Sequence, residues 1–216
     1  MVKFFLQCAA FLSFIFTYMD CSGKEVAKAA HQELTKHEAS KPLDDYVKKI
    51  EDYFNNISVF FADFTQKNKD GSKSCGYFLM KERKLKMEYT IPATNVVIIK
   101  NNKVILFDNE LKEKTVTSAY SSPFSFLLRR KIDLRKNLEI LAFSEDEKTT
   151  SISLRNKNDD NGIMITIYFS KNPITLLGWE IFPNHKDLKT EMSTKITLHN
   201  HDWHRKISDN EFNTYD

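Results

Sequence analysis

Alternating apolar and polar positions between residues 76 and 118 predict a series of short antiparallel strands. The apolar residues of Leu85–Ile91 fall on one face of such a strand: Leu85, Met87, Tyr89 and Ile91. Pro92 ends this strand, because proline has no N–H to donate to a ladder. Val96–Lys100 and Lys103–Asp108 predict two more strands, joined by Asn101-Asn102, a dipeptide that tolerates the positive φ angles of a two-residue hairpin.

The remaining strands follow at short intervals on both sides of this region. Val59–Gln66 predicts a strand with Phe60, Ala62 and Phe64 on one face, and a turn follows at Lys69–Gly71. Four later segments have strand character: Thr149–Arg155, Ile163–Ser170, Ile174–Phe182 and Glu191–His199, with a turn at Asn158–Gly162 between the first two. The chain lacks the regular helical crossovers that parallel strands require, so we expect an antiparallel sheet and an α+β fold.

Two regions are predicted to be helical. The first begins near Ser40–Lys41, with Pro42 in its first turn, and its apolar residues recur at helical spacing: Leu43, Tyr46, Val47, Ile50, Tyr53, Phe54 and Ile57. The second starts at Ser122-Pro123, an N-cap followed by a first-turn proline, and contains the apolar segment Phe124–Leu128. We expect it to continue as a helix through Asp133–Leu141.

The amino terminus resembles a secretory signal peptide. Lys3 provides a positive charge, an apolar run extends from Phe4 to Met19, and Cys21–Gly23 offers small residues for cleavage. We therefore expect a signal peptide at 1–23, a loose segment at 24–41 and a single domain at 42–216. The alternative is a retained anchor, although a run of this length is short for the roughly 20 residues that span a bilayer.

Composition and motifs argue against several functions. The net charge of +3 is small and the basic residues are interspersed with acidic ones, which disfavours nucleic-acid binding. Cys75 is the cysteine that follows the predicted leader, and we interpret it as a small half-buried residue. In the segment His199–His204, His199 and His201 are expected on one side of an extended strand, and Asp202 could add an oxygen, so a zinc or copper site is conceivable. Solvated histidines in a terminal hairpin are the ordinary explanation. Because no catalytic motif accompanies them, we expect neither an enzyme nor a metal or cofactor.

The order of the strands and their motifs resembles the LolA-like family of periplasmic carriers of outer-membrane lipoproteins. The resemblance extends over roughly 46–212 and rests on these segments: Phe60–Gln66, Gly76–Lys81, Leu85–Pro92, Val104–Asp108, Ser122–Leu128 and Phe169–Glu180. One departure occurs at the turn Lys81–Lys84, where the family usually has Arg-Pro and this chain keeps only the basic charge.

The resemblance implies a fold, a site and a function. The fold would be a strongly bent, incompletely closed antiparallel half-barrel whose concave side is covered by a helical lid, with the other side facing water. The residues expected to form the lipid cavity or its lid contacts are Phe60, Phe64, Met87, Tyr89, Leu127 and Trp179. Lys81, or alternatively Arg83, would hold the lid shut by donating hydrogen bonds to lid carbonyls.

By the same resemblance, the protein would be a monomeric periplasmic chaperone without a cofactor. It would accept acylated lipoproteins from an inner-membrane ABC-type releasing transporter and deliver them to an outer-membrane receptor. Two alternatives remain open from the sequence. One is a half-barrel protein that senses lipid or regulates a partner without transport, and the other is a metal-dependent hydrolase that uses the histidine segment.

Overall fold

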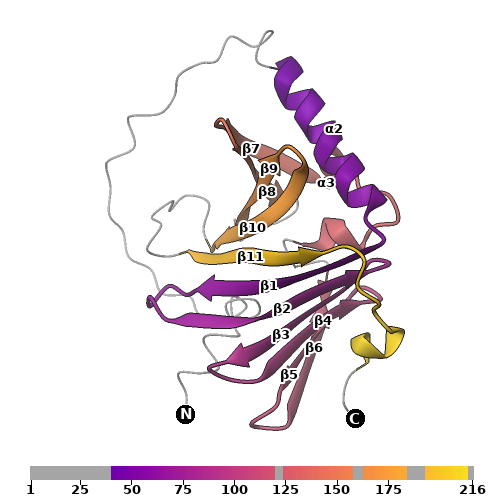
Figure 1. Cartoon of the computed structure of the whole chain (residues 1–216), viewed down its shortest axis with the longest axis vertical. Coiled ribbons are helices and arrows are strands. Elements are labelled where there is room, and N and C mark those ends of the chain that lie inside the picture. The colour runs from indigo at the N-terminus through magenta and orange to yellow at the C-terminus, as the bar shows by residue number, and fades with distance from the viewer. Residues whose placement is uncertain (1–39, 120–123, 158–162, 184–192, 214–216) are drawn as a thin grey trace.

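The computed structural model describes residues 40–119, 124–157, 163–183 and 193–213. Their strands form one antiparallel sheet with the order β6-β5-β4-β3-β2-β1-β11-β10-β9-β8-β7. The bounds are β1 Val59–Lys67, β2 Lys73–Lys81, β3 Lys84–Ile91, β4 Asn95–Lys100, β5 Lys103–Asp108, β6 Glu113–Ser118, β7 Leu138–Glu145, β8 Thr149–Asn156, β9 Met164–Lys171, β10 Ile174–Phe182 and β11 Thr194–Asp202. The first and last strands pair at the centre, and the sheet curves into an open half-barrel (Figure 1).

Most of the predicted strands are confirmed to within a few residues, but the predicted helix over Asp133–Leu141 is wrong. Only one helical turn forms, α3 at Leu134–Asn137, and the Asp133 side chain caps it by accepting a hydrogen bond from the Lys136 N–H. The chain then enters β7, which pairs with β8 along its length. Pairing with β8 outweighs the weak helical spacing of the leucines. The predicted leader, the N-cap at Ser122 and the turn at Asn158–Gly162 lie outside the described residues.

The concave face of the sheet is covered by two pieces of chain. One is α2, Ser40–Asn56, which lies beside β7–β10 (Figure 1) and faces the sheet with the predicted apolar stripe. The other is the segment 124–134, here called the lid segment, which contains the 3-10 helix η4, Ser125–Leu128. The buried apolar residues of the lid segment are Phe124, Phe126, Leu127, Ile132 and Leu134. These two pieces and the inward side chains of the strands form one continuous core.

The convex face is not left entirely to solvent, which corrects the expectation of a sheet with one wet side. On β1–β5 it carries a second apolar cluster, which includes Phe61, Leu79 and Ile98. The segment Ile207–Phe212, here called the C-terminal strap, ends in the 3-10 helix η6, Asp209–Phe212, and lies against these strands near β3 (Figure 1). Its residues Ile207 and Phe212 are buried in this cluster.

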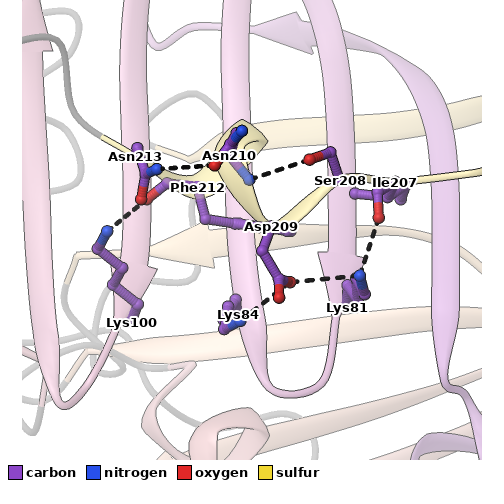
Figure 2. A network of polar contacts seen from close by, with 9 residues as sticks. All are labelled: Lys81, Lys84, Lys100, Ile207, Ser208, Asp209, Asn210, Phe212 and Asn213. Carbon is purple, nitrogen blue, oxygen red and sulfur yellow. Dashed lines mark hydrogen bonds and ion pairs between the residues drawn. The ribbon is translucent and has the colours of Figure 1, made fainter.

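Polar contacts attach the strap to the strands beneath it, as Figure 2 shows. Lys81 Nζ donates to the Ile207 carbonyl at 2.9 Å, and Lys100 Nζ donates to the Phe212 carbonyl at 2.6 Å. The Asp209 carboxylate lies 3.2 Å from both Lys81 and Lys84. The hydrogen bonds that Lys84 and Lys81 donate to the Asp209 carboxylate lower its pKa.

An ion pair between a buried lysine and a half-buried glutamate lies on the same convex face. Lys86 is almost fully buried, and its Nζ lies 2.8 Å from Glu88 and 3.5 Å from Glu211 of the strap. The Tyr77 hydroxyl also donates to Glu88. Burial raises the pKa of Glu88, but the hydrogen bonds from Lys86 and Tyr77 outweigh it, so the pKa is lowered overall. Glu88 therefore stabilises the fold most when it is ionised.

A bulge in β10 sets which of its side chains face inward. The register between β9 and β10 shifts between Leu176 and Gly178, so Leu176 and Trp179 both face the core, although strict alternation would separate them. Gly178 has a φ of 146°, and a Cβ there would lie 2.1 Å from the Ile196 carbonyl oxygen of β11. The bulge thus depends on glycine at this position.

We predict that Gly178→Ala destabilises the protein by roughly 3 kcal/mol, because it combines a disfavoured φ with a backbone clash. Gly71→Ala is the matched control, since Gly71 has a φ of 80° but a Cβ added there would meet nothing within 4 Å. It should cost only about 1 kcal/mol. Urea denaturation measures both, and equal losses would contradict the role of the close β10–β11 approach.

We also predict that Glu88→Gln lowers the free energy of unfolding by about 1–2 kcal/mol at pH 7, because it removes a charge-assisted contact to buried Lys86. The wild-type carboxylate contributes this stability above its ordinary pKa of 4.5 and loses it as the pH falls through the lower value of the folded state. The difference should therefore shrink as acid is added below about pH 4.5. Exposed Glu113→Gln is the control. A difference that stays constant to pH 3 would contradict the assignment.

Candidate functional site: a lidded apolar cavity

A small cavity lies in the core between the curved sheet and its two covers. It is lined by apolar side chains from both halves of the sheet and from both covers: Phe54, Phe78, Leu85, Met87, Val97, Ile99, Phe124, Leu127, Ile167, Leu176 and Trp179. Strands β2–β4 supply one wall, β9 and β10 supply the opposite wall, and α2 and the lid segment close the space. Such a lining offers no nucleophile and no acid or base, so it suits an apolar ligand rather than catalysis.

The cavity is nearly filled in this state. Its free volume is about 30 Å³, whereas ligand sites typically enclose roughly 300–1,000 Å³. An acyl chain cannot enter until some of the lining side chains move. The lid segment contributes Phe124 and Leu127 to this lining.

The structure places the six predicted cavity residues in the concave core, but only half of them at the cavity itself. Met87, Leu127 and Trp179 line it. Phe60 packs instead against Phe78, against His201 of β11 and against Trp203, which follows β11. Phe64 and Tyr89 pack against each other, with ring centroids 5.1 Å apart.

Aromatic contacts at the end of α2 hold the covers against the sheet. The ring of Phe54 lies 5.9 Å from the ring of Phe126 in the lid segment and 5.7 Å from the ring of Phe169 in β9, both edge to face. Tyr53 also meets Phe169 edge to face, and its hydroxyl accepts a hydrogen bond from the Leu176 N–H at 3.1 Å. The helix end therefore connects the lid segment to β9 and β10.

A group of hydrogen bonds fixes the lid segment to α2. The Asn55 amide acts as a backbone mimic: its Oδ1 accepts from the Ile132 N–H at 2.8 Å and its Nδ2 donates to the Ile132 carbonyl at 3.0 Å. The Glu51 carboxylate accepts from the Leu134 N–H at 2.8 Å. No pattern in the sequence marks these two polar residues, because their role depends on which loop the fold brings beside them.

Arg83 joins this group from the β2–β3 turn. Its Nη1 donates to the Phe54 carbonyl at 3.0 Å, and its Nη2 donates to Asn55 Oδ1 at 3.3 Å. Burial lowers the pKa of the guanidinium. Of the two predicted latch residues, Arg83 thus makes the kind of contact that the prediction describes, although its carbonyl partner belongs to α2.

Lys81 contacts the opposite cover. Its ammonium binds the Ile207 carbonyl and Asp209 of the C-terminal strap on the convex face (Figure 2). The conformation of the β2–β3 turn explains why this chain lacks the proline that the family usually has there. Glu82 and Arg83 have φ angles of 48° and 66°, which the proline ring cannot adopt.

The histidine segment does not form the arrangement that a metal would need. Asn200 has a φ of 53°, and the register between β1 and β11 shifts at this point, so His199 and His201 do not share a face. His199 is exposed, whereas His201 stacks on Trp203 and lies 2.8 Å from the Leu176 carbonyl. Among the described residues there is no cluster of three or more metal-ligating side chains. Cys75 is half-buried, as predicted.

A second, open groove lies at the carboxyl end of α2. It has a volume of about 490 Å³ and is lined by Lys49, Asp52, Tyr53, Asn56, Ile57, Ser58, Val59, Ile174 and Trp203. Its rim carries opposite charges, so it lacks the uniformly apolar lining of the cavity. In the described part of the chain, no helix combines the length and apolarity needed to cross a bilayer.

Fold and site together define a half-barrel binding protein with an apolar cavity under a hydrogen-bonded lid. Comparison with known proteins agrees with this class. The family model described as outer membrane lipoprotein carrier protein LolA matches residues 55–215, and the chain belongs to this family. No curated protein matches the chain at a significant level.

Solved structures with a similar fold share little sequence with this chain. An uncharacterized conserved protein from Thermus thermophilus is 9% identical, with a TM-score of 0.51 and coverage of 82% of this chain and 95% of the other. A LolA superfamily protein from Nitrosomonas europaea is 8% identical, with a TM-score of 0.44 and coverage of 78% and 97%. The Mycobacterium tuberculosis lipoprotein LppX is 8% identical, with a TM-score of 0.38 and coverage of 73% and 95%.

The two basic residues of the β2–β3 turn should act on different covers. We predict that Arg83→Leu speeds hydrogen exchange of the Ile132 and Leu134 amides by roughly tenfold or more, because it removes charge-assisted hydrogen bonds to the end of α2. Lys81→Leu should leave these amides unchanged and instead speed exchange at Glu211 and Asn213, whose N–H groups donate within the strap.

Amide-resolved hydrogen exchange on both variants provides the test, and each variant serves as the other's control. Unchanged exchange at Ile132 in Arg83→Leu would remove Arg83 from the lid. Faster exchange at Ile132 in Lys81→Leu would show that the strap and the lid open together.

Proposed function

We propose that this protein is a periplasmic lipoprotein chaperone that shields the acyl chains of mature lipoproteins in its concave cavity. In this proposal it accepts them from an inner-membrane releasing transporter of the ABC type and hands them to an outer-membrane receptor. The observation that carries the proposal is a cavity lined by aliphatic and aromatic side chains, closed by a lid that polar contacts hold, in a chain that belongs to the family of outer-membrane lipoprotein carriers.

The family description supports a role in binding lipid or lipoprotein, and family membership supports a periplasmic or secreted location. The predicted signal peptide at 1–23 agrees with that location. The cavity lining adds a physical reason, because it offers an acyl chain an apolar environment without a group that could react with it.

The energetics suit a carrier that must also release its cargo. Each methylene taken out of water contributes about 0.8 kcal/mol, so a long acyl chain would bind too tightly if it gained this in full. Opening the cavity separates the Phe54–Phe126 contact and the Asn55–Ile132 hydrogen bonds, and this cost offsets part of the gain. A receptor that binds the same acyl chains can then compete for them.

The proposal predicts that lipoprotein co-purifies with the protein from the periplasm and that Met87→Gln weakens its binding roughly fivefold or more. Met87 lines the cavity, and an amide there lacks a hydrogen-bond partner when the acyl chain is bound, which costs roughly 1–3 kcal/mol. The measurement is the ratio of lipoprotein to carrier in the purified complex, followed by its transfer to receptor-bearing membranes.

Leu79→Gln is the matched control for this measurement. Leu79 is as buried as Met87 and belongs to the same hairpin, but it faces the convex cluster. This variant should lose similar stability and still bind lipoprotein. Normal binding by Met87→Gln would place the acyl chains elsewhere, and binding without transfer would favour a lipid sensor over a carrier.

A further inference from the structure

One of the residues that line the cavity carries a polar atom without an assigned role, the indole nitrogen of Trp179. The side chain is 2% exposed, and within the described part of the chain its Nε1 has no hydrogen-bond partner. A buried N–H that is left unpaired costs roughly 1–3 kcal/mol relative to a satisfied one. Buried polar groups in native proteins almost always have partners, so an exception next to a ligand cavity indicates a group reserved for the ligand.

The described residues around Trp179 include two aromatic rings and the apolar cavity lining. Its ring meets Phe124 of the lid segment at 5.2 Å and Phe78 of β2 at 5.5 Å, both edge to face. The rest of the cavity lining is apolar. No side-chain amide, hydroxyl or charged group of this lining can accept the indole proton.

The bulge in β10 determines which way the Trp179 side chain faces. The β10 bulge at Gly178 turns Trp179 toward the concave side together with Leu176, where regular alternation would turn it away. A phenylalanine at the same position would fill similar space without introducing an unpaired donor.

We propose that the Trp179 N–H is a ligand-recognition group that donates a hydrogen bond to an acyl carbonyl oxygen of the bound lipid. This inference rests on the proposed function and adds a chemical class to it: ester-linked acyl chains, rather than alkyl chains without a carbonyl. A carbonyl oxygen next to a long chain is an acceptor that enters an apolar cavity together with the chain. Among the described residues, the ring contacts of Trp179 are with Phe78 and Phe124, and neither ring can accept the indole proton as a carbonyl oxygen does.

The test compares two synthetic lipopeptides that have the same chain lengths and differ only at the glyceryl linkage. One carries an S-diacylglyceryl cysteine with two ester carbonyls, and the other carries an S-dialkylglyceryl cysteine with ether oxygens, which are weaker acceptors. The dissociation constant of each is measured for the purified wild-type protein, for Trp179→Phe and for Trp203→Phe. Trp203 lies outside the cavity and is the matched control.

We expect the wild-type protein and Trp203→Phe to bind the ester roughly three- to tenfold more tightly than the ether, the range that one neutral hydrogen bond supports. Trp179→Phe should bind the two lipopeptides equally. Equal affinity of the wild-type protein for the ester and the ether lipopeptide would overturn the assignment and leave the carrier function intact. So would a preference for the ester that persists in Trp179→Phe. Failure of the wild-type protein to bind either lipopeptide would instead overturn the proposed function.

A second measurement does not depend on the stability of the Trp179 variant. The protein is labelled with ¹⁵N-tryptophan, and comparison with Trp203→Phe assigns the two indole N–H resonances. The Trp179 resonance should move downfield on addition of the ester lipopeptide and move clearly less with the ether. Equal movement with both ligands would show that the indole N–H responds to chain packing rather than to a carbonyl, and would contradict the proposal.

Discussion

The structure depends on one constraint: an open, strongly curved sheet must keep its concave apolar face out of water. A closed barrel would bury this face by itself, but this sheet ends at β6 and β7 without joining. Separate pieces of chain must therefore cover it, and Phe54 is where they meet. Its ring contacts the lid segment and β9, and its carbonyl accepts a hydrogen bond from Arg83. The covers are held at their edges by polar contacts and at their centre by aromatic packing.

This arrangement makes the empty and the loaded states compete for the same apolar surface. Phe124 and Leu127 are buried against the concave side, and the free volume between them and the sheet is about 30 Å³. A ligand must replace those contacts. Its net binding free energy is therefore the gain from burying the ligand minus the loss when Phe124 and Leu127 leave the concave side. The hydrogen bonds that Asn55 and Glu51 of α2 make with the lid segment then add to the free energy needed to open the cavity.

The sequence predicts the sheet well, because period-two patterns report the inward face wherever strands are regular. Leu85 and Met87 are placed correctly on this basis. Prediction fails where tertiary contacts decide. Leu138 pairs with β8 instead of extending a helix, and Asn200 adopts a positive φ that separates His199 from His201. The inward position of Trp179 is predicted here from family resemblance. Regular alternation along β10 cannot place both Leu176 and Trp179 inward, because that requires the bulge at Gly178.

The candidate site is harder to predict than the fold, because cavity lining depends on position along a strand as well as on its face. Phe64 and Tyr89 face the same side as Met87 but lie nearer the end of the half-barrel, where Tyr89 donates to Gln66 at 2.8 Å. Periodicity cannot distinguish these positions. Nor can it pair Asn55 with Ile132, which are 77 residues apart. Such contacts require the topology first.

The convex face of the sheet has a cover of its own, the C-terminal strap. Val96 and Ile98 of β4 face away from the cavity and would expose apolar surface to water without the C-terminal strap. By burying them, the strap stabilises the half of the sheet that forms one cavity wall, through contacts that do not involve the lid. The β2–β3 turn supplies one basic residue to the strap, Lys81, and one to α2, Arg83. Because the strap and α2 are held by different residues, we expect the concave side to open while the convex side stays packed, so that the cavity wall keeps its shape.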